Sequence, residues 1–351
     1  MSRDDHGALR EAALFAALVE ALGEPTLLID AANRVQAGNA AARAIVPALR
    51  LGAPLAMALR DPDVLAAVAR ARSEGAAQTA RWREHGAVER IFEARAAPVV
   101  AADGMIALTL DDLTQAWRLD RIRADFVANA SHELRTPLAS LLGFIETLQG
   151  PAREDARARE RFLDVMRDQA LRMSRLIDDL LSLSRVERNL HIRPTRAVDL
   201  RDLVAHIAET LAPLAASREA RLDLDLEPVL VAGDRDELAR MIENLIENAL
   251  KYGLPEHGPG RVEITLKHEG RDAALVVRDY GRGVASEHLP RLTERFYRVD
   301  PGASRAQGGT GLGLALVKHV VARHGGRMTI WSRPGEGAAF RVAIPVMKAV
   351  S

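Results

Sequence analysis

Hydrophobic residues recur at alternating steps of four and three along two stretches between Leu113 and Val186, which is the spacing of an amphipathic helix. The first stretch carries Leu134, Leu138, Leu141, Ile145 and Leu148. The second carries Phe162, Met166, Gln169, Met173, Leu176, Leu180 and Leu183, of which only Gln169 is polar. Gly150 and Pro151 lie between them and end a helix. The pattern predicts an antiparallel helical hairpin over residues 116–188. Because two helices leave part of their apolar stripes in water, we expect an identical hairpin to complete a dimeric four-helix bundle.

Short apolar segments alternate with helical patterns from residue 189 to residue 351. Strands are predicted at 190–195, 221–227, 261–269, 273–279, 327–333 and 338–345, and helices at 199–216, 234–252 and 311–325. Runs of strands with few helices favour an α/β sandwich whose helices cover one face of the sheet. We therefore expect a separate C-terminal α/β sandwich domain.

Residues 12–115, which follow a tail of residues 1–11, mix strand and helix signals. We predict a strand at 25–30, a second strand that runs into a helix, and two later antiparallel strands joined by a turn at Asp103 and Gly104. The stretch LLIDAANRVQAGNAAA resembles PAS sensor domains, which implies an input domain; another kind of small α+β domain is the alternative. The whole chain is thus predicted to be a multidomain α+β protein.

Charge balance and the lack of cysteine narrow the possible functions. Lys and Arg together number 48, as do Asp and Glu, which excludes nucleic-acid binding driven by bulk charge. With no cysteine, the chain has no disulfides and no thiolate metal sites. The most apolar early stretch, residues 12–22, is too short to cross a bilayer and contains Glu20. We expect a cytoplasmic protein without a transmembrane segment, which associates with a membrane only through a partner.

The stretch NASHELRTPLASL contains the most reactive combination of side chains. His132 lies well off the apolar stripe and should face solvent, with Glu133 beside it and Thr136 one turn further on the same face. Pro137 removes a helix hydrogen bond at a cost of about 3 kcal/mol, which favours a functional reason for the sequence.

A neutral imidazole has one free ring nitrogen, and a carboxylate that holds the proton on the other nitrogen makes it more nucleophilic. His132 and Glu133 are therefore suited to accept a phosphoryl group, and the Thr136 hydroxyl to position water for its hydrolysis. An ordinary exposed histidine on a charged helix is the alternative.

The predicted helix at 234–252 suggests a site for the phosphoryl donor. Asn244 and Asn248 share one of its faces, with Lys251 nearby. Buried amides are costly unless they bind a ligand, and their carbonyl oxygens suit Mg²⁺. A plain polar helix face is the alternative.

Two glycine-containing segments complete the set of motifs. In VVRDYGRGV, Asp279 can accept the amino group of adenine while Gly281 and Gly283 let the backbone approach the base, although this spacing is also that of an ordinary turn. In GGTGLGLALVKH, glycines lead directly into a helix and present backbone amides to a phosphate. These glycines are Gly308, Gly309, Gly311 and Gly313. The segment is neither a P-loop nor a dinucleotide fingerprint. Residues 298–307 before it are predicted to form a mobile lid.

In their order along the chain, these motifs closely resemble the two-component sensor histidine kinases. The H, N, first glycine, F, second glycine and third glycine boxes correspond to SHELRTP, NLIENALKY, DYGRG, RFYRVD, GGTGLGLALVKH and PGEGAAF. The resemblance covers about residues 118–346, and ADFVANASHELRTPLASLLGFIETL is particularly similar to the phosphate-regulon sensor kinases. It implies a Bergerat-type ATP-binding sandwich over 189–351, ATP and Mg²⁺, a homodimer, and the receiver domain of a response regulator as partner.

The resemblance also implies roles for individual residues. His132 is the expected phosphoacceptor, Glu133 the base that polarises it and Thr136 the phosphatase-type position, while Asn248 is the expected Mg²⁺ ligand with Asn244 nearby. The expected nucleotide contacts are Lys251, Tyr252, Asp279, Gly281, Gly283, Gly309, Thr310, Gly311, Leu312 and Gly313, with Arg298 or Arg305 on the γ-phosphate. The expected reaction passes the γ-phosphoryl group to the histidine and then to an aspartate of the regulator. Phosphatase activity and phosphate-responsive signalling are also expected.

Two other classes remain open at the level of sequence. A conformational ATPase of the chaperone or topoisomerase kind would use the same sandwich, but it needs a catalytic glutamate where Asn244 stands and leaves SHELRTP unexplained. A non-catalytic helical scaffold with a vestigial ATP site is the other alternative, against which the complete set of glycines, Asn248 and Asp279 argues.

Overall fold

The computed structural model describes residues 16–84, 89–100, 104–255, 258–300, 302 and 309–347. The predicted tail of residues 1–11, Asp103, Arg305, Gly308 and most of the predicted lid lie outside the described residues. The chain divides into two compact units, Met1–Val127 and Ala128–Ser351. All the described residues of the predicted site belong to the second unit.

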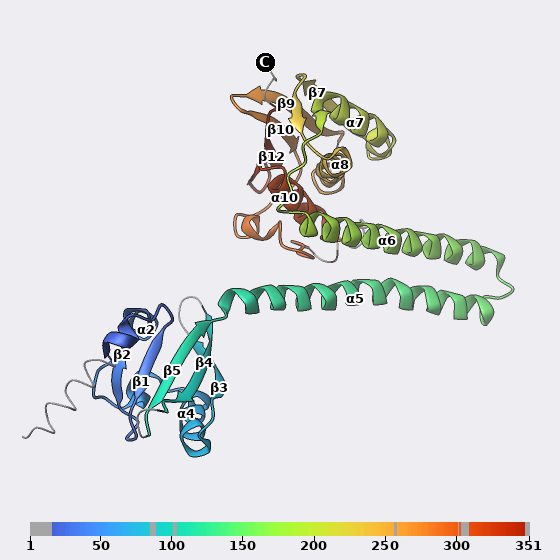
Figure 1. Cartoon of the computed structure of the whole chain (residues 1–351). Helices are drawn as coiled ribbons and strands as arrows, with labels where there is room; N and C mark the ends of the chain where they lie inside the picture. The colour runs from blue at the N-terminus through green and yellow to red at the C-terminus, as the bar shows by residue number, and fades with distance from the viewer. Residues whose placement is uncertain are drawn as a thin grey trace, which may run out of the picture. The chain divides into compact units, whose positions relative to one another are not determined.

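Two long helices, α5 (Thr114–Gln149) and α6 (Ala156–Arg188), form the predicted hairpin (Figure 1). Residues 150–155 connect them, and the Asp155 side chain accepts a hydrogen bond from the Ala158 amide at 2.9 Å, which caps the start of α6. Near the loop, the rings of Phe144 and Phe162 lie 5.1 Å apart and hold the two helices together. The helix α5 continues through Pro137 without a break.

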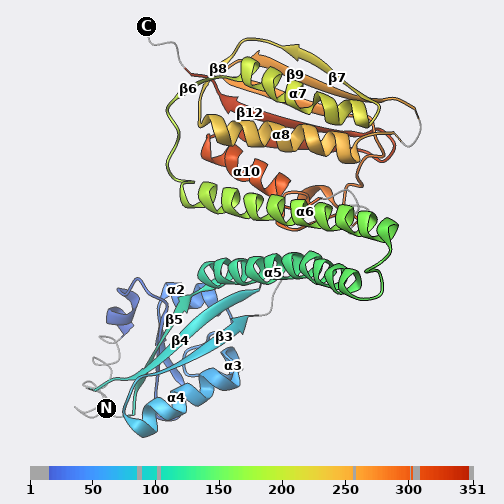
Figure 2. The ribbon, with the colours of Figure 1, turned by 90° about the vertical axis from the view of Figure 1, so that its right-hand side faces the viewer.

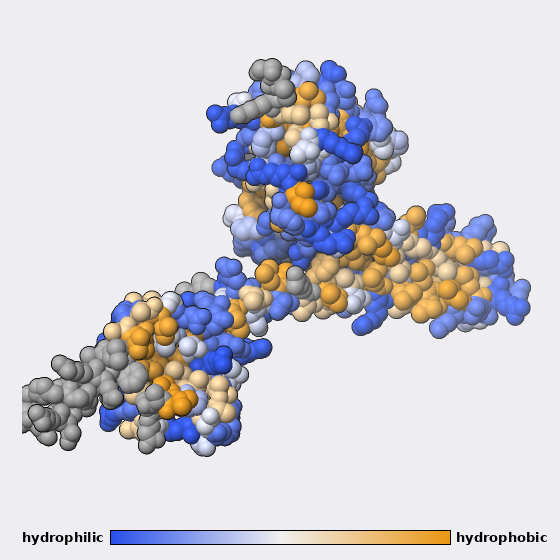
Figure 3. All heavy atoms as spheres, viewed as in Figure 1, coloured by the Kyte–Doolittle hydropathy of each residue, from blue (hydrophilic) through white to orange (hydrophobic). Residues whose placement is uncertain are grey.

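The hairpin leaves a second set of apolar side chains in solvent, which Figure 3 shows along its length. In the part of the hairpin that belongs to the second unit, the large exposed apolar residues are Leu138, Leu142, Ile145, Leu163, Val165, Leu171, Ile177 and Leu181. Only Ala158, Leu176, Leu183 and Val186 are buried on α6. Exposed apolar surface of this extent on one element is typical of an interaction surface.

The rest of the second unit is an α/β sandwich with a five-stranded sheet in the order β11-β12-β10-β9-β7. The strands are β7 (Ala220–Leu226), β9 (Gly260–Glu269), β10 (Asp272–Asp279), β11 (Arg327–Ser332) and β12 (Ala338–Pro345). All neighbours are antiparallel except β7 and β9, which are parallel. Two short strands, β6 (Ala197–Asp199) and β8 (Leu230–Ala232), pair separately. Figure 2 shows the helices α7 (Leu200–Ser217), α8 (Arg235–Tyr252) and α10 (Gly313–Arg323) side by side over the sheet.

The predicted helices and strands of this domain are confirmed except at residues 190–195, where a strand was expected and turns are found. The alternation of Leu190 and Ile192 is not a buried face, because both side chains are exposed. The backbone here is held by a side chain, since Arg323 Nε donates to the carbonyls of Asn189 and Ile192, both at 3.1 Å. The short strands β6 and β8 were not predicted.

Helix α8 is the central element of the sandwich, because it packs on the sheet through a wholly apolar face. Asp234 caps its start by accepting from the amides of Asp236 and Glu237. The buried residues of α8 are Leu238, Met241, Ile242, Leu245, Ile246, Ala249 and Leu250. Each large side chain buried in this way contributes about 1.5–3 kcal/mol. Because the apolar face is held against the sheet, the opposite, polar face of α8 always points the same way, toward the cavity described below.

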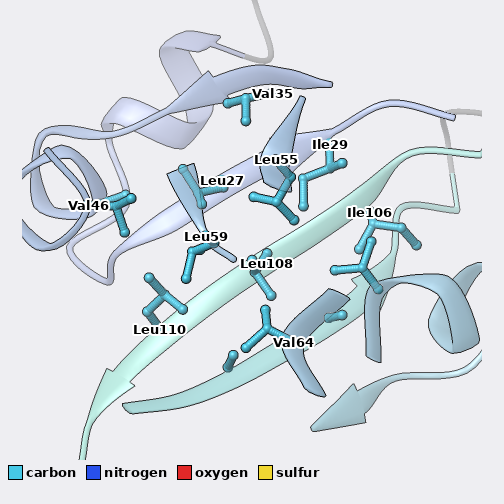
Figure 4. Packing of buried hydrophobic residues seen from close by; sticks show 14 of the residues in the cluster. Leu27, Ile29, Val35, Val46, Leu55, Leu59, Val64, Ile106, Leu108 and Leu110 are labelled. Atoms are coloured by element: carbon cyan, nitrogen blue, oxygen red, sulfur yellow. The ribbon is translucent and has the colours of Figure 1, made fainter. Parts of the chain in front are cut away.

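The first unit contains a five-stranded antiparallel sheet in the order β2-β1-β5-β4-β3. Its strands are β1 (Thr26–Ile29), β2 (Val35–Gly38), β3 (Gln78–Glu84), β4 (Arg90–Pro98) and β5 (Ile106–Asp112), and its helices are α2 (Ala40–Ile45), α3 (Leu55–Ala58) and α4 (Pro62–Glu74). Figure 4 shows Leu27, Ile29 and Leu108 of the sheet packed with residues of the helices. The predicted strands are confirmed, whereas β3, α3 and α4 were not predicted.

Candidate active site

A cavity of about 470 Å³ opens among α8, the end of β10, the segment leading into α10, and α6. Its volume is in the range of small-molecule sites. The wall carries the cations Arg175, Arg240, Lys251, Arg282 and Arg298 and the carboxylates Asp178, Asp179, Glu243, Glu247, Asp279 and Asp300. The mixture of charges suits a ligand that is itself charged and polar.

The polar face of α8 forms one wall. Glu243, Asn244, Glu247 and Asn248 recur along it at helical spacing and all line the cavity. The Asn244 side-chain amide donates to the carbonyl of Arg240 at 2.8 Å, one turn earlier in the helix.

Charge interactions on this wall hold the side chains in place. Lys251 forms an ion pair with Glu247. Burial raises the pKa of Glu243, and the nearby Glu247 carboxylate raises it further. A cation or a hydrogen-bond donor arriving in the cavity would therefore be stabilised along this helix.

Asp279 ends β10 almost fully buried. One of its carboxylate oxygens, Oδ1, accepts from the amides of Gly281 at 3.2 Å and Ala338 at 3.0 Å. No donor reaches the other oxygen, Oδ2, among the described residues. Burial raises the pKa of Asp279, although the two amides act in the opposite direction. The free oxygen at the cavity wall is well placed to accept a hydrogen bond from an amino group.

Glycines let the backbone pack closely around Asp279. Gly337 has a φ of +76°, and a Cβ there would lie 2.1 Å from the Asp279 carbonyl oxygen. A Cβ on Gly281 would lie 2.5 Å from the backbone of Gly253. A side chain at Gly337 would therefore displace the strand that presents the carboxylate, and one at Gly281 would displace the end of α8.

The glycine-rich segment before α10 forms the opposite side of the cavity. Gly311 has a φ of +74°, and its carbonyl accepts from the Phe296 amide at 2.8 Å. A Cβ on Gly313 would lie 2.3 Å from Asn244 Oδ1, so a side chain there would push the Asn244 amide out of its present position. The cavity thus receives the positive end of the α10 dipole, where anions bind.

Arg298 connects the cavity to helix α5. Its guanidinium donates to the Glu133 carboxylate at 3.0 Å, and Arg172 of α6 lies 3.5 Å from the same carboxylate. The side chains of Arg298 and Glu133 are only 6% and 14% exposed, so this ion pair is well shielded from water. Within the described part of the chain, Arg298 Nε is buried and has no acceptor. The guanidinium therefore has a donor to spare for a ligand in the cavity.

His132, the neighbour of Glu133, is exposed on α5. The Thr136 hydroxyl donates to the His132 carbonyl at 3.2 Å, so it lies one turn along the same face. Neither side chain lines the cavity. Their connection to it runs through Glu133 and Arg298.

The structure brings most of the predicted nucleotide contacts together at one cavity. Those that line it are Asn244, Asn248, Lys251, Tyr252, Asp279, Gly283, Arg298, Gly309, Thr310, Gly311 and Gly313. Two do not line it. Leu312 is fully buried in the domain, where its amide donates to Thr310 Oγ1 at 3.3 Å, and Gly281 contributes only the amide that holds Asp279.

Several cavity residues were not predicted. Glu243 and Glu247 each stand one position before Asn244 and Asn248, and the four residues repeat at helical spacing. The spacing in α8 could therefore have indicated at least Glu247. Asp178 and Asp179 of α6 carry no signal in the sequence, because they reach the cavity only through the packing of the hairpin on the sandwich.

Comparison with known protein families assigns both parts of the second unit. Residues 122–189 match the His Kinase A (phospho-acceptor) domain, and residues 233–348 match the histidine kinase-, DNA gyrase B- and HSP90-like ATPase domain. The fold and the cavity thus define a phosphoacceptor hairpin joined to an ATPase-type sandwich. The chain belongs to the two-component sensor histidine kinases.

Among curated relatives, the chain is similar to the phosphate regulon sensor protein PhoR of Pseudomonas aeruginosa, with 45% identity over 231 residues. That alignment covers 65% of this chain and 51% of the relative. The sensor-like histidine kinase SenX3 of Mycolicibacterium smegmatis is 36% identical over 237 residues, which cover 67% of this chain and 61% of the relative. The chain therefore spans about half to three-fifths of the length of these relatives.

Among solved structures, the histidine kinase ThkA in complex with the response regulator protein TrrA is similar in fold, with a TM-score of 0.51. The match covers 95% of this chain and 99% of that one at 17% identity. None of the helices in the described ranges is both long and apolar enough to cross a bilayer.

Proposed function

We propose that this protein is an ATP-dependent protein-histidine kinase, which phosphorylates His132 and passes the phosphoryl group to an aspartate of a response regulator. The observation that carries the proposal is the ion pair between Arg298, in the wall of the cavity, and Glu133, the neighbour of an exposed histidine. It links an ATPase-type cavity directly to a candidate phosphoacceptor. Family membership and the PhoR and SenX3 relatives support the same activity.

In this proposal each side of the cavity holds one part of ATP. Asp279 accepts a hydrogen bond from the adenine amino group through Oδ2, the oxygen that has no donor within the described ranges. The segment Gly309–Gly313 and the start of α10 hold the phosphates with backbone amides, and Lys251 and Arg298 neutralise their charge. Tyr252 lines the same cavity and packs on the nucleotide.

The chemical step is an in-line displacement. A ring nitrogen of His132 attacks the γ-phosphorus, the bond to the β-γ bridging oxygen breaks, and ADP leaves. Glu133 holds the proton on the other ring nitrogen, which keeps the attacking nitrogen free. For this step Glu133 must exchange Arg298 for the imidazole, so the arrangement described here is a docked state that precedes or follows the reaction.

The residues present fit a magnesium ion. Asn248 offers an amide oxygen, a hard donor of the kind that Mg²⁺ takes, and the carboxylate of Glu247 lies on the same wall. Bound Mg²⁺ would neutralise phosphate charge and orient the triphosphate. Asn248 is the proposed ligand, with Asn244 holding the helix geometry beside it.

Partners and organisation follow from the same assignment. The exposed position of His132 and Thr136 suits a receiver domain that must reach the phosphohistidine, and Thr136 would position water for the reverse, phosphatase reaction. The apolar side chains exposed on α5 and α6 suit a homodimeric four-helix bundle over residues 116–188. We place the protein in the cytoplasm, in phosphate-responsive signalling.

The first unit is proposed to be a PAS-like input domain within residues 12–115. Its antiparallel sheet with the order β2-β1-β5-β4-β3 supports this assignment. Residues 189–351 are the corresponding catalytic domain.

The test is autophosphorylation with radiolabelled ATP, using His132→Gln and His206→Gln. The two histidines are closely matched, because His206 is also exposed on a helix and its carbonyl also accepts from a threonine one turn on, Thr210, at 2.9 Å. His132→Gln should abolish acid-labile labelling and keep nucleotide binding, whereas His206→Gln should label normally. Label that persists in His132→Gln rejects the phosphoacceptor. Release of free phosphate without any labelled protein would instead identify a conformational ATPase.

A further inference from the structure

Helix α6 places the carboxylate of Asp179 in the wall of the nucleotide cavity. The proposed reaction gives this carboxylate no role. Asp179 Oδ2 accepts a hydrogen bond from the Thr310 hydroxyl at 2.8 Å, and both residues line the cavity. Asp178 lines it as well, and Arg175 is the cation that α6 adds to the wall. The hairpin thus contributes more negative than positive charge to a site for a polyanion.

The contact lies in the part of the cavity where phosphates bind. Thr310 stands three positions before Gly313, the first residue of α10, in the glycine segment whose amides and helix dipole attract anions. The Asp179 carboxylate bound to Thr310 therefore takes up space that the terminal phosphate of a nucleotide would need, and its negative charge repels that phosphate.

The surroundings of Asp179 disfavour its ionised form even without a ligand. Burial raises the pKa of Asp179, and the Glu247 carboxylate acts in the same direction. The Thr310 hydroxyl, Arg240 and Lys251 oppose that shift without cancelling it. Each phosphate charge brought close to this carboxylate adds repulsion that solvent screens poorly in a half-buried site.

We propose that Asp179 makes the docked arrangement discriminate between nucleotides, so that the cavity binds ADP in preference to ATP while Thr310 is held on α6. This inference rests on the proposed function. A γ-phosphate competes with the carboxylate for the glycine segment, so ATP binds fully only when Thr310 leaves Asp179. ATP binding is thereby coupled to release of the catalytic domain from its hairpin, whereas ADP leaves the domain docked.

The Thr310 contact is one of several that join α6 to the sandwich, since α10 also packs along α6. Among the described residues, the polar contacts at the same surfaces include Arg295 to Glu187 at 2.6 Å and His319 to Glu187 at 3.3 Å. Both end at one side chain on α6 and neither reaches the cavity. Asp179 is thus the contact between α6 and the sandwich that a nucleotide meets directly.

The experiment compares the affinities of the full chain for ADP and for the non-hydrolysable β,γ-imido analogue of ATP, both with Mg²⁺, by calorimetric titration. The variants are Asp179→Asn, which keeps the size of the side chain and removes its charge, and Asp179→Ser, which keeps a hydroxyl partner for Thr310. Asp168→Asn is the matched control, because it removes one negative charge from an exposed position of the same helix outside the cavity.

We expect the wild-type chain to bind ADP more tightly than the analogue. Asp179→Asn should raise the affinity for the analogue by about tenfold and change that for ADP by less than about twofold. Asp179→Ser should shift the ratio in the same direction, and Asp168→Asn should leave it unchanged. Equal changes for both nucleotides, or none, overturn the role of Asp179 while the kinase assignment stands. A wild-type chain that binds neither nucleotide overturns the proposed function and this inference with it.

Discussion

At the scale of single residues, the most informative contact in the second unit joins Arg298 to Glu133. In the proposed reaction the guanidinium belongs on the γ-phosphate and the carboxylate belongs on His132. While they bind each other, the Glu133 carboxylate is not on His132, so in the proposed mechanism this ion pair keeps the kinase reaction from starting. In this proposal, the two groups that take part in the chemistry also hold the docked arrangement.

Replacing Arg298 tests the catalytic half of that argument. Arg298→Ala should lower the rate of autophosphorylation by at least about tenfold, because the charge that develops on the γ-phosphoryl group loses its guanidinium. ATP affinity should fall much less than the rate does. Single-turnover labelling at saturating ATP measures the first quantity and calorimetry the second.

Arg295→Ala is the control for Arg298→Ala. Arg295 also forms an ion pair with the hairpin, through Glu187, but it does not line the cavity. Its loss should weaken docking and leave the rate of the chemical step within about threefold of wild type. Should both variants slow labelling equally, Arg298 acts through docking alone.

Three carboxyl groups in the cavity, those of Asp179, Glu243 and Asp279, have a pKa raised chiefly by burial. A raised pKa means that the contribution of each group to stability is present below its unfolded value and is lost as the pH rises through its folded value. At neutral pH the charged groups therefore work against the fold. Cations and donors supplied by a bound ligand relieve this unfavourable charge, which is common at functional sites.

At the scale of elements, the loop between β11 and β12 packs against Asp279, at the end of the cavity where we propose that adenine binds. It contains two glycines with positive φ, Gly335 at +82° and Gly337 at +76°. They differ in their surroundings. A Cβ on Gly335 would meet nothing within 4 Å, whereas a Cβ on Gly337 would strike the backbone of Asp279.

This difference makes the two glycines a matched pair of mutants. Gly335→Ala should cost about 1–2 kcal/mol of unfolding free energy, from backbone strain alone, and should leave nucleotide affinity unchanged. Gly337→Ala should cost more and lower nucleotide affinity by at least about tenfold, because β10 must move. Urea unfolding and nucleotide titration measure the two effects. Equal behaviour of the two variants would show that the loop does not position Asp279.

At the scale of the whole molecule, the exposed apolar side chains of the hairpin support the proposed homodimer. Leu142 of α5 is 53% exposed and Leu171 of α6 is 54% exposed, although both helices are otherwise amphipathic. A dimer that buries these residues would gain about 25 cal/mol per Å² of apolar surface removed from water.

A charged residue in this surface should break the dimer. Leu142→Glu should convert the chain from dimer to monomer in size-exclusion chromatography with light scattering, while nucleotide binding is retained. Glu154→Lys is the control, since it makes a larger change of charge at a residue that is 94% exposed in the loop between α5 and α6, away from the helix faces. A Leu142→Glu protein that remains dimeric would exclude the hairpin as the dimer interface.

The sequence predicted the elements better than it predicted their contacts. The periodicity of α5, α6 and α8 defined these helices closely, because a buried face imposes a regular spacing on a long element. The strand expected at 190–195 was wrong, since two apolar residues in alternation also occur in turns whose backbone is held by a side chain, here Arg323. The short strands β6 and β8 were missed, because three residues carry too little pattern to detect.

In the candidate site, too, the sequence predicted single motifs but not the contacts between distant side chains. Asn244, Asn248, Asp279 and the glycines could be selected from the sequence, because each motif is local and its chemistry depends on residues a few positions apart. Asp179 and the partnership of Glu133 with Arg298 could not be selected. Each depends on side chains more than a hundred positions apart, which meet only because the hairpin packs against the sandwich.

By itself, then, the sequence determined which residue types would bind a nucleotide and which histidine would be exposed on a helix. Local spacing and amphipathic period are sufficient for both. Only the tertiary structure decided which carboxylates enter the cavity and what Arg298 binds in the docked arrangement. Those facts follow from how two surfaces of the chain fit together, and no short stretch of sequence encodes that fit.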